Sequence, residues 1–169
     1  EVQTGLGRTG EWFGFQHYGV RPDVVTMAKA LGNGVPIGAC WARDEVAAAF
    51  VPGDHATTFG GQPLATAAAR AVLDVMRAED VPARARRAGD RLTETLRAVP
   101  GVADVRGLGL LIAVELAPDH PAGPVAAAAL DAGLVVNAVT PTALRLAPSL
   151  LVTDEEIDEA AAILTKVLS

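Results

Sequence analysis

Residues 24–39 read VVTMAKALGNGVPIGA, and this stretch decides the fold of the first part of the chain. It holds two short apolar runs on either side of a glycine-rich turn, and its only charge is on Lys29. Apolar and β-branched runs bounded by Gly and Pro are typical of buried strands. We therefore expect buried strands at residues 23–27 and 37–42, with Lys29 just after the first.

Lys29 is one of only two lysines in a chain with twelve arginines, and the other, Lys166, lies three residues from the C-terminus. An ammonium is costly to bury without a partner, whereas a neutral amine or an imine is much less so. An isolated lysine in an apolar stretch therefore indicates a chemical task, most simply imine formation with a carbonyl. The alternative is a lysine at the edge of a lobe, with its stem on apolar surface and its charge in water.

Beyond this stretch, helical and extended patterns alternate. A loop at 51–62 precedes a helix at 63–79, which begins with a proline and carries Ala and Leu on most faces. We expect that helix to be deeply buried. The next helix, at 82–98, has one apolar face, because apolar residues recur at steps of three and four. These residues are Val81, Ala85, Ala88, Leu92, Leu96 and Val99.

The last part of the chain predicts a smaller unit of strands and helices. Thr153, followed by Glu156 three residues later, is the capping-box signature of a final helix. The element order predicts an α/β lobe at residues 1–80 and an α+β lobe at 81–169. The expected elements of the second lobe are strands at 102–106 and 110–116, a helix near 124–132 that stops at Gly133, strands at 134–137 and 143–147, and the final helix.

Composition excludes several classes of protein. With 169 residues, half of them hydrophobic, the chain is long enough to bury a core. A net charge of −6 and a pI near 5.0 argue against nucleic acid or an anionic membrane as a partner. No apolar run reaches the roughly 18 residues that cross a bilayer. The single cysteine, Cys40, lies in an apolar run, and we expect a buried thiol in a cytoplasmic protein.

Gly5, Gly7 and Gly10 match G-x-G-x-x-G, the dinucleotide-binding fingerprint. That fingerprint needs a strand directly before it and a helix directly after it. Only four residues precede Gly5, and the following segment, GEWFGFQHYG, is aromatic and interrupted by glycine. We therefore interpret this region as a glycine-rich loop, and a nicotinamide oxidoreductase is disfavoured.

Four ordered blocks resemble one family. They are EVQTGLGRTGEWFGFQHYGVRPDVVTMAKALGNGVPIGA at 1–39, TTFGGQPLA at 57–65, VRGLGLLIAVEL at 105–116 and ALRLAPSLLVTDEEID at 143–158. They resemble the class III aminotransferases, enzymes of fold type I that depend on pyridoxal phosphate. The resemblance covers essentially the whole chain. It implies that residues 1–80 are the C-terminal half of the large cofactor-binding domain and residues 81–169 the small C-terminal α+β domain.

The same resemblance implies roles for the residues that match the family's motifs. Lys29 matches the lysine that bonds covalently to the cofactor aldehyde and later moves a proton between substrate and cofactor. Gln3 matches the glutamine that hydrogen-bonds the phenolic oxygen of the cofactor, although a lone glutamine could equally serve a cap or the surface. Thr57 and Thr58 match a hydroxyl pair, of which the second donates to the cofactor phosphate across a homodimer interface. An ordinary turn is the alternative for TTFGG.

Arg145 stands in an otherwise apolar strand, LRLAP. The resemblance makes it the anchor of the substrate α-carboxylate, for which a planar fork with two parallel N–H bonds is well suited. A structural ion pair is the alternative. Arg8 also matches the family motif, and we expect it to support the loop structurally. His17, His55 and His120 match no family role, and their spacing does not predict a metal site.

Part of the family pattern is absent from the chain. The aspartate that keeps the cofactor ring nitrogen protonated should directly precede Glu1, and Glu1 is not a substitute for it. We therefore expect the chain to be the C-terminal portion of a longer enzyme and to be inactive alone, exposing apolar surface that favours association.

The segment at 134–150 is most similar to the acetylornithine aminotransferases. The expected reaction of the longer enzyme is amino transfer from N-acetylornithine to 2-oxoglutarate. An ornithine, succinylornithine or 4-aminobutyrate aminotransferase is the alternative.

Overall fold

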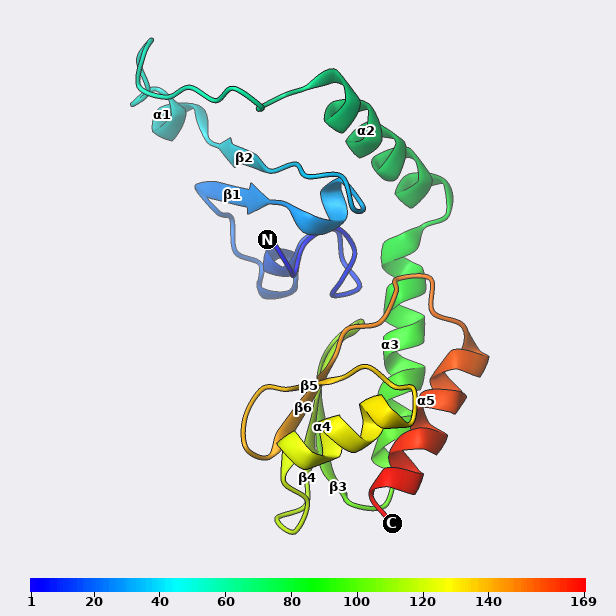
Figure 1. Ribbon diagram of the computed structural model, residues 1–169. Helices are drawn as coiled ribbons and strands as arrows, with labels where there is room; N and C mark the ends of the chain where they lie inside the picture. Colours follow the sequence, from blue (N-terminus) through cyan, green and yellow to red (C-terminus); the bar gives the residue numbers. More distant parts are fainter.

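A computed structural model describes the whole chain, residues 1–169 (Figure 1). The first half holds a short antiparallel sheet and a long helix, whereas the second half holds a four-stranded sheet with three helices. The elements in order are η1 (Gly14–Tyr18), β1 (Val24–Met27), η2 (Lys29–Leu31), β2 (Ala39–Ala42), α1 (Asp44–Ala47), α2 (Pro63–Ala78), α3 (Val81–Arg97), β3 (Val102–Leu108), β4 (Leu111–Leu116), α4 (Ala122–Asp131), β5 (Asn137–Ala138), β6 (Ala143–Leu146) and α5 (Asp154–Val167).

Strands β1 and β2 form where the apolar runs predict them, and they pair antiparallel with Val25 opposite Trp41. The expectation that they are buried is wrong. Only Val25 is buried, Trp41 is 49% exposed, and the Cys40 thiol is exposed as well. The reason is that the two strands pair only with each other, so no further strand or helix layer of the chain covers both of their faces.

Helix α2 begins at Pro63, as predicted, but it is not deeply buried. Of its sixteen residues, only Ala69 and Met76 are buried, whereas Leu64 is 76% exposed. In Figure 1 the helix (green) lies along the edge of the first half. Alanine on several faces allows close packing but does not require it.

Helix α3 confirms the predicted amphipathic face. Ala85, Leu92 and Leu96 are at most 2% exposed, while Arg86 and Arg87 on the other face are exposed to solvent. Burying a leucine side chain fully stabilises a fold by about 1.5–3 kcal/mol, so this stripe fixes α3 to its neighbours. In Figure 1 the helix runs from the first half down the length of the second.

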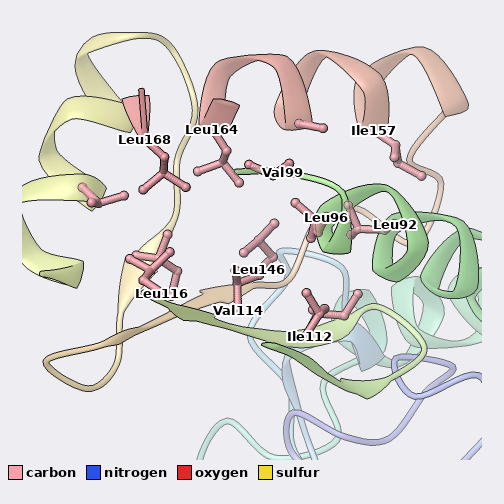
Figure 2. Packing of buried hydrophobic residues seen from close by; sticks show 14 of the residues in the cluster. Leu92, Leu96, Val99, Ile112, Val114, Leu116, Leu146, Ile157, Leu164 and Leu168 are labelled. Carbon is pink, nitrogen blue, oxygen red and sulfur yellow. The ribbon is translucent and has the colours of Figure 1, made fainter. Parts of the chain in front are cut away.

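The four-stranded sheet has the order β3-β4-β6-β5, with antiparallel pairs throughout. Figure 2 shows Ile112, Val114 and Leu146 on the face that meets the helices. They belong to a core of 17 buried residues contributed by the sheet together with α3, α4 and α5. The opposite face of the sheet carries Ala113 and Arg145, which is half-buried.

Two predictions for the second half differ in outcome. The expected strand at 134–137 is reduced to Asn137–Ala138, because residues 134–136 form no ladder with β6. The capping box of α5 is confirmed: the N–H of Glu156 donates to the Thr153 hydroxyl at 3.2 Å, and the N–H of Thr153 donates to the Glu156 carboxylate at 2.8 Å.

The two halves meet at the loop that contains Arg8. The guanidinium of Arg8 donates to the carbonyls of Leu110 and Pro148, at 3.0 and 2.6 Å. The N–H of Leu110 in turn donates to the Arg8 carbonyl at 2.9 Å. Burial lowers the pKa of Arg8 from its ordinary value. This structural role agrees with the sequence expectation. None of the helices is both long and apolar enough to cross a membrane.

Candidate active site

Lys29 lies on a cleft of about 940 Å³ at the junction of the two halves. The walls are mostly apolar and come from five places in the chain: the N-terminal loop, the turn after β1, one face of α2, the start of α3 and the segment after β6. The cleft also holds Gln3 and Arg8. The fold therefore brings together two residues, Lys29 and Gln3, that are 26 positions apart and were singled out from the sequence.

Lys29 itself is exposed, so the prediction of an interior lysine is wrong for this chain. It opens the short helix η2 directly after β1. The end of the strand fixes its backbone, and the 940 Å³ cleft leaves its amine open to solvent and to a ligand. The apolar residues next to Lys29 in the sequence favour their own burial. They do not determine whether the side chain of Lys29 is covered.

The backbone of the cleft is unusual. Four non-glycine residues of the chain have positive φ, and three of them, Leu6 (57°), Lys29 (46°) and Asn33 (45°), line this cleft. A left-handed conformation costs a side-chain-bearing residue roughly 1–2 kcal/mol and occurs preferentially at functional sites. The sequence analysis did not single out Leu6 or Asn33. The only feature of the sequence that could have indicated a left-handed backbone here is Asn33, because asparagine adopts that conformation more often than most residues.

Arg145 lies on a second cleft of about 870 Å³, and Gln3 lines that cleft as well as the first. Arg145 is half-buried on β6, and its Nη2 donates to the side-chain oxygen of Asn137 at 3.1 Å. Its Nε is buried without a hydrogen-bond partner, and so is the hydroxyl of Thr9, which is 4% exposed and lines the same cleft. Gln3 is thus the residue that joins the lysine cleft to the arginine cleft.

Thr57 and Thr58 lie apart from both clefts. They are exposed in the loop between α1 and α2, which extends away from the junction of the two halves (Figure 1). The structure therefore does not bring them together with Lys29 within one chain.

Glu1 uses its carboxylate to close the N-terminal loop. It accepts hydrogen bonds from the Thr4 hydroxyl (2.7 Å) and from the N–H groups of Gly14 (2.9 Å) and Phe15 (3.0 Å). Burial raises the pKa of this carboxyl, but the hydrogen bonds outweigh burial and leave the pKa below its ordinary value. Through these three hydrogen bonds, the Glu1 carboxylate stabilises the loop that carries Gln3.

Chemically, the two clefts combine an amine, an amide and a guanidinium that retains donors without a protein partner. The amine can attack a carbonyl and carry a proton. The amide can donate to an oxygen without adding charge, and the guanidinium can bind a carboxylate through two parallel bonds. This set suits a reaction on an amino acid more than it suits hydrolysis, for which the clefts offer no Ser, His and Asp arrangement.

Comparison with known proteins agrees with this chemistry. Residues 1–168 match the family described as aminotransferase class-III. Over its full length the chain is 53% identical to the acetylornithine aminotransferase of Corynebacterium efficiens, covering 42% of that protein. It is also 44% identical to the acetylornithine aminotransferase of Methanothermobacter thermautotrophicus, covering 44% of it. The chain belongs to the class III aminotransferase family, and it spans less than half the length of these curated relatives.

The solved structures that match the chain are also aminotransferases. The ornithine aminotransferase of Toxoplasma gondii superposes with a TM-score of 0.89 at 36% identity, over 99% of this chain and 42% of that one. A transaminase from Arthrobacter, described as S-selective, gives a TM-score of 0.91 at 31% identity, again over 99% and 42%. A further structure of the Toxoplasma enzyme is reported with partial occupancy of pyridoxal phosphate at its active site.

Proposed function

We propose that the complete protein is a pyridoxal-phosphate-dependent aminotransferase that moves an amino group from N-acetylornithine to 2-oxoglutarate. The observation that carries this proposal is that Gln3 lines both clefts, so that the Lys29 amine and the Arg145 guanidinium face neighbouring spaces joined by one amide. An amine that reacts with a cofactor and a fork that holds a carboxylate are needed together on one amino-acid substrate.

The residues of the first cleft fit pyridoxal phosphate. Its apolar walls suit an aromatic ring, its volume of about 940 Å³ is ample for a small cofactor, and its polar groups include one amine and one amide. When bound, this cofactor supplies an aldehyde and an electron-withdrawing ring. Gln3 lines this cleft and is exposed, so its amide can donate to a cofactor oxygen.

In this proposal Lys29 acts twice through its Nζ atom. It would hold the cofactor through a covalent bond, and once released it would take a proton from the substrate α-carbon and deliver it to a carbon of the cofactor. Arg145 binds the α-carboxylate and so orients the substrate for that proton transfer. The left-handed backbone at Lys29 fixes where the side chain starts, which supports a positioned rather than a mobile amine.

Thr57 and Thr58 fit this scheme as donors to the cofactor phosphate of a second copy. Their exposure in a glycine-containing loop, away from the clefts of their own chain, supports a role between subunits. Hydroxyl and backbone N–H groups in such a turn suit a phosphate dianion. The proposed assembly is therefore a homodimer.

The assignment of N-acetylornithine as the amino donor rests on the relatives of highest identity given above, at 44–53%. Ornithine is the second candidate, because the Toxoplasma ornithine aminotransferase superposes well at 36% identity. A free, exposed cysteine is compatible with the reducing cytoplasm, where we place the reaction.

We further propose that residues 1–80 are the C-terminal half of a large cofactor-binding domain and residues 81–169 a small C-terminal domain. Two separate hydrophobic clusters support this division, one of five buried residues and one of 17. The boundary is shared, because Val81 at the start of α3 belongs to the smaller cluster and Leu150 packs against both.

The test is covalent labelling of the complete protein loaded with pyridoxal phosphate. After borohydride reduction, we expect mass spectrometry to find the cofactor on Lys29. Lys29→Ala should remove both the label and the turnover of N-acetylornithine with 2-oxoglutarate. Lys166→Ala is the matched control, because it removes the other lysine of residues 1–169 and should leave both intact.

Label on another residue, or turnover that survives Lys29→Ala, would refute the role of Lys29. A panel of N-acetylornithine, ornithine, succinylornithine and 4-aminobutyrate then identifies the donor. The amine with the highest kcat/KM decides the specificity, and a preference for ornithine would overturn the N-acetylornithine assignment alone.

A further inference from the structure

A proline interrupts the ladder between β4 and β6 at one end. The N–H of Leu116 donates to the Thr142 carbonyl at 2.8 Å, and the two strands keep a constant register from there. Every second pair of an antiparallel ladder exchanges backbone hydrogen bonds, so the same register makes Leu110 and Pro148 another such pair. Proline has no N–H to donate, and these two residues therefore cannot complete the exchange by themselves.

Arg8 supplies hydrogen bonds to this pair from outside the sheet. Its Nη1 donates to the Leu110 carbonyl at 3.0 Å and to the Pro148 carbonyl at 2.6 Å. Its own carbonyl accepts the N–H of Leu110 at 2.9 Å. One residue of the N-terminal loop therefore joins the chain just before β4 to the chain just after β6.

The chain that Arg8 holds after β6 connects the two clefts. Arg145, which lines the second cleft, is the last residue but one of β6 and lies three residues before Pro148. Residues on both sides of Pro148 line the first cleft together with Lys29 and Arg8. In Figure 1 the chain leaves β6 (orange) toward the first half before it turns to α5. Strand ends fray most easily, so a loss of order at this end of β6 would reach Arg145.

We infer that Arg8 is a positioning residue for carboxylate binding. By completing the last pair of the β4–β6 ladder it prevents the end of β6 from fraying, and so it holds the Arg145 guanidinium in place relative to the Lys29 amine. This inference rests on the proposed function, because it takes a substrate carboxylate as the ligand of Arg145. If Arg8 were only structural, its loss would lower stability and leave carboxylate binding by the folded protein unchanged.

The experiment compares Arg8→Met with the wild type, both as the complete protein loaded with pyridoxal phosphate. Methionine keeps an unbranched apolar stem and removes the donors. Calorimetric titration with glutarate, an unreactive dicarboxylate, should show an affinity weakened about tenfold, which is typical of losing one hydrogen bond between charged groups. In turnover, KM for 2-oxoglutarate should rise about tenfold as well, whereas kcat should fall less.

Arg8→Lys tests whether the two carbonyl bonds carry the effect. Both bonds leave a single nitrogen, Nη1, and an ammonium also has enough donors on one nitrogen to make them. The lysine variant should therefore bind glutarate more tightly than Arg8→Met. A lysine variant that binds no better than Arg8→Met would overturn the role of these bonds.

Arg97→Met is the matched control. Nη2 of Arg97 also donates to a backbone carbonyl, that of Val105 at 3.2 Å, but both residues belong to the second half and lie outside both clefts. This change should lower the unfolding temperature and leave glutarate affinity and KM unchanged. Thermal unfolding shows which variants remain folded. If Arg8→Met does not fold, Arg8→Gln takes its place, because glutamine is too short to reach both carbonyls.

A double-mutant cycle tests whether Arg8 acts through Arg145. With Arg145 present, Arg8→Met should lower kcat/KM for 2-oxoglutarate about tenfold. In the Arg145→Ala background the same change should lower it by less than about twofold, because no guanidinium remains to be positioned. An equal loss in both backgrounds would mean that Arg8 binds the substrate directly, and the positioning role would be wrong.

The failure of this inference and the failure of the proposed function give different results. If Arg8→Met binds glutarate as tightly as the wild type while Arg145→Ala binds it more weakly, the positioning role is wrong and the proposed function is untouched. If Arg145→Ala binds glutarate as tightly as the wild type, or if neither binds it, Arg145 is not the carboxylate anchor. The proposed site and this inference then fall together.

Discussion

Glu1 shows how a single carboxylate organises a loop. Its three hydrogen bonds reach the Thr4 hydroxyl and the backbone of Gly14 and Phe15, and so they join the two ends of the first 15 residues. The loop carries Gln3, which lines both clefts, and Arg8, which joins the two halves. Glu1 itself lines the second cleft, and its hydrogen bonds help to position other residues of both clefts.

The lowered pKa of Glu1 predicts a pH dependence of stability. Because the folded pKa lies below the ordinary value of 4.5, the stabilising contribution is fully present above that value and is lost as pH falls through the folded pKa. We expect Glu1→Gln to be less stable than the wild type near neutral pH. The difference should be at most about 1 kcal/mol, because the group is largely solvated.

Urea unfolding of both proteins between about pH 7 and about pH 3 measures this dependence. The two curves of unfolding free energy should converge at the acid end. Glu159→Gln on α5 is the control, since that exposed side chain makes no hydrogen bond or ion pair. A difference that stays constant down to the lowest pH would show that the Glu1 carboxylate contributes through its shape and not through its charge.

At the scale of elements, the sequence predicts where helices and strands lie better than it predicts their burial. The apolar stripe of α3 and the capping box of α5 are local patterns, repeated within three or four residues, and the structure confirms both. The burial of β1, β2 and α2 depends on which elements pack against them. The sequence predicted correctly that these three elements form, but the prediction that they are buried was wrong.

The two ends of α5 allow one prediction with an internal control. Thr153→Ala removes the side-chain acceptor for the N–H of Glu156 and should cost about 1 kcal/mol of unfolding free energy. Thr165→Ala removes a hydroxyl that donates to the Ala161 carbonyl inside the helix at 2.8 Å. A carbonyl inside a helix already accepts the backbone N–H four residues later, so the hydroxyl bond is an additional one. Alanine is also the better helix former, so the free energy of unfolding should change by no more than about 0.5 kcal/mol.

Denaturant unfolding of the two variants gives both values. Equal losses at the two positions would mean that the threonine methyl groups, and not the capping hydrogen bond, carry the effect.

At the scale of the whole molecule, the junction of the two halves depends on backbones that approach closely. An added Cβ at Gly89 in α3 would overlap the Gly109 carbonyl oxygen, and a Cβ at Gly109 would lie 2.5 Å from the Thr9 carbonyl carbon. Helix α3, the β3–β4 turn and the N-terminal loop therefore meet through glycine. The Arg8 hydrogen bonds to Leu110 and Pro148 lie in the same region.

This contact reverses an expectation from helix propensity. In a helix interior, alanine is normally more stable than glycine by about 1 kcal/mol. Gly89→Ala should instead destabilise the protein by about 1–3 kcal/mol, because the methyl group forces α3 away from the turn. Comparing Arg87→Ala with Arg87→Gly at an exposed position two residues away measures the propensity alone, and there alanine should be the more stable.

Thermal unfolding of the four proteins decides between packing and propensity. If alanine stabilised position 89 as it does position 87, the close approach of α3 to the turn would be disproved. The clefts at this junction would then be less rigid than the glycine contacts indicate.

The sequence by itself determined the order of the elements, the amphipathic face of α3, the capping box of α5 and the identity of Lys29, Gln3, Arg8 and Arg145 as residues of interest. The elements and the isolation of Lys29 depend on residue type and on spacing over a few residues, whereas Gln3, Arg8 and the role of Arg145 were singled out by the resemblance to a family. Only the tertiary structure decided that Gln3 lines both clefts, that Asn137 holds Arg145 and that position 89 excludes a side chain. Each of these depends on atoms that chain folding brings together from separate segments, and no local period records such contacts.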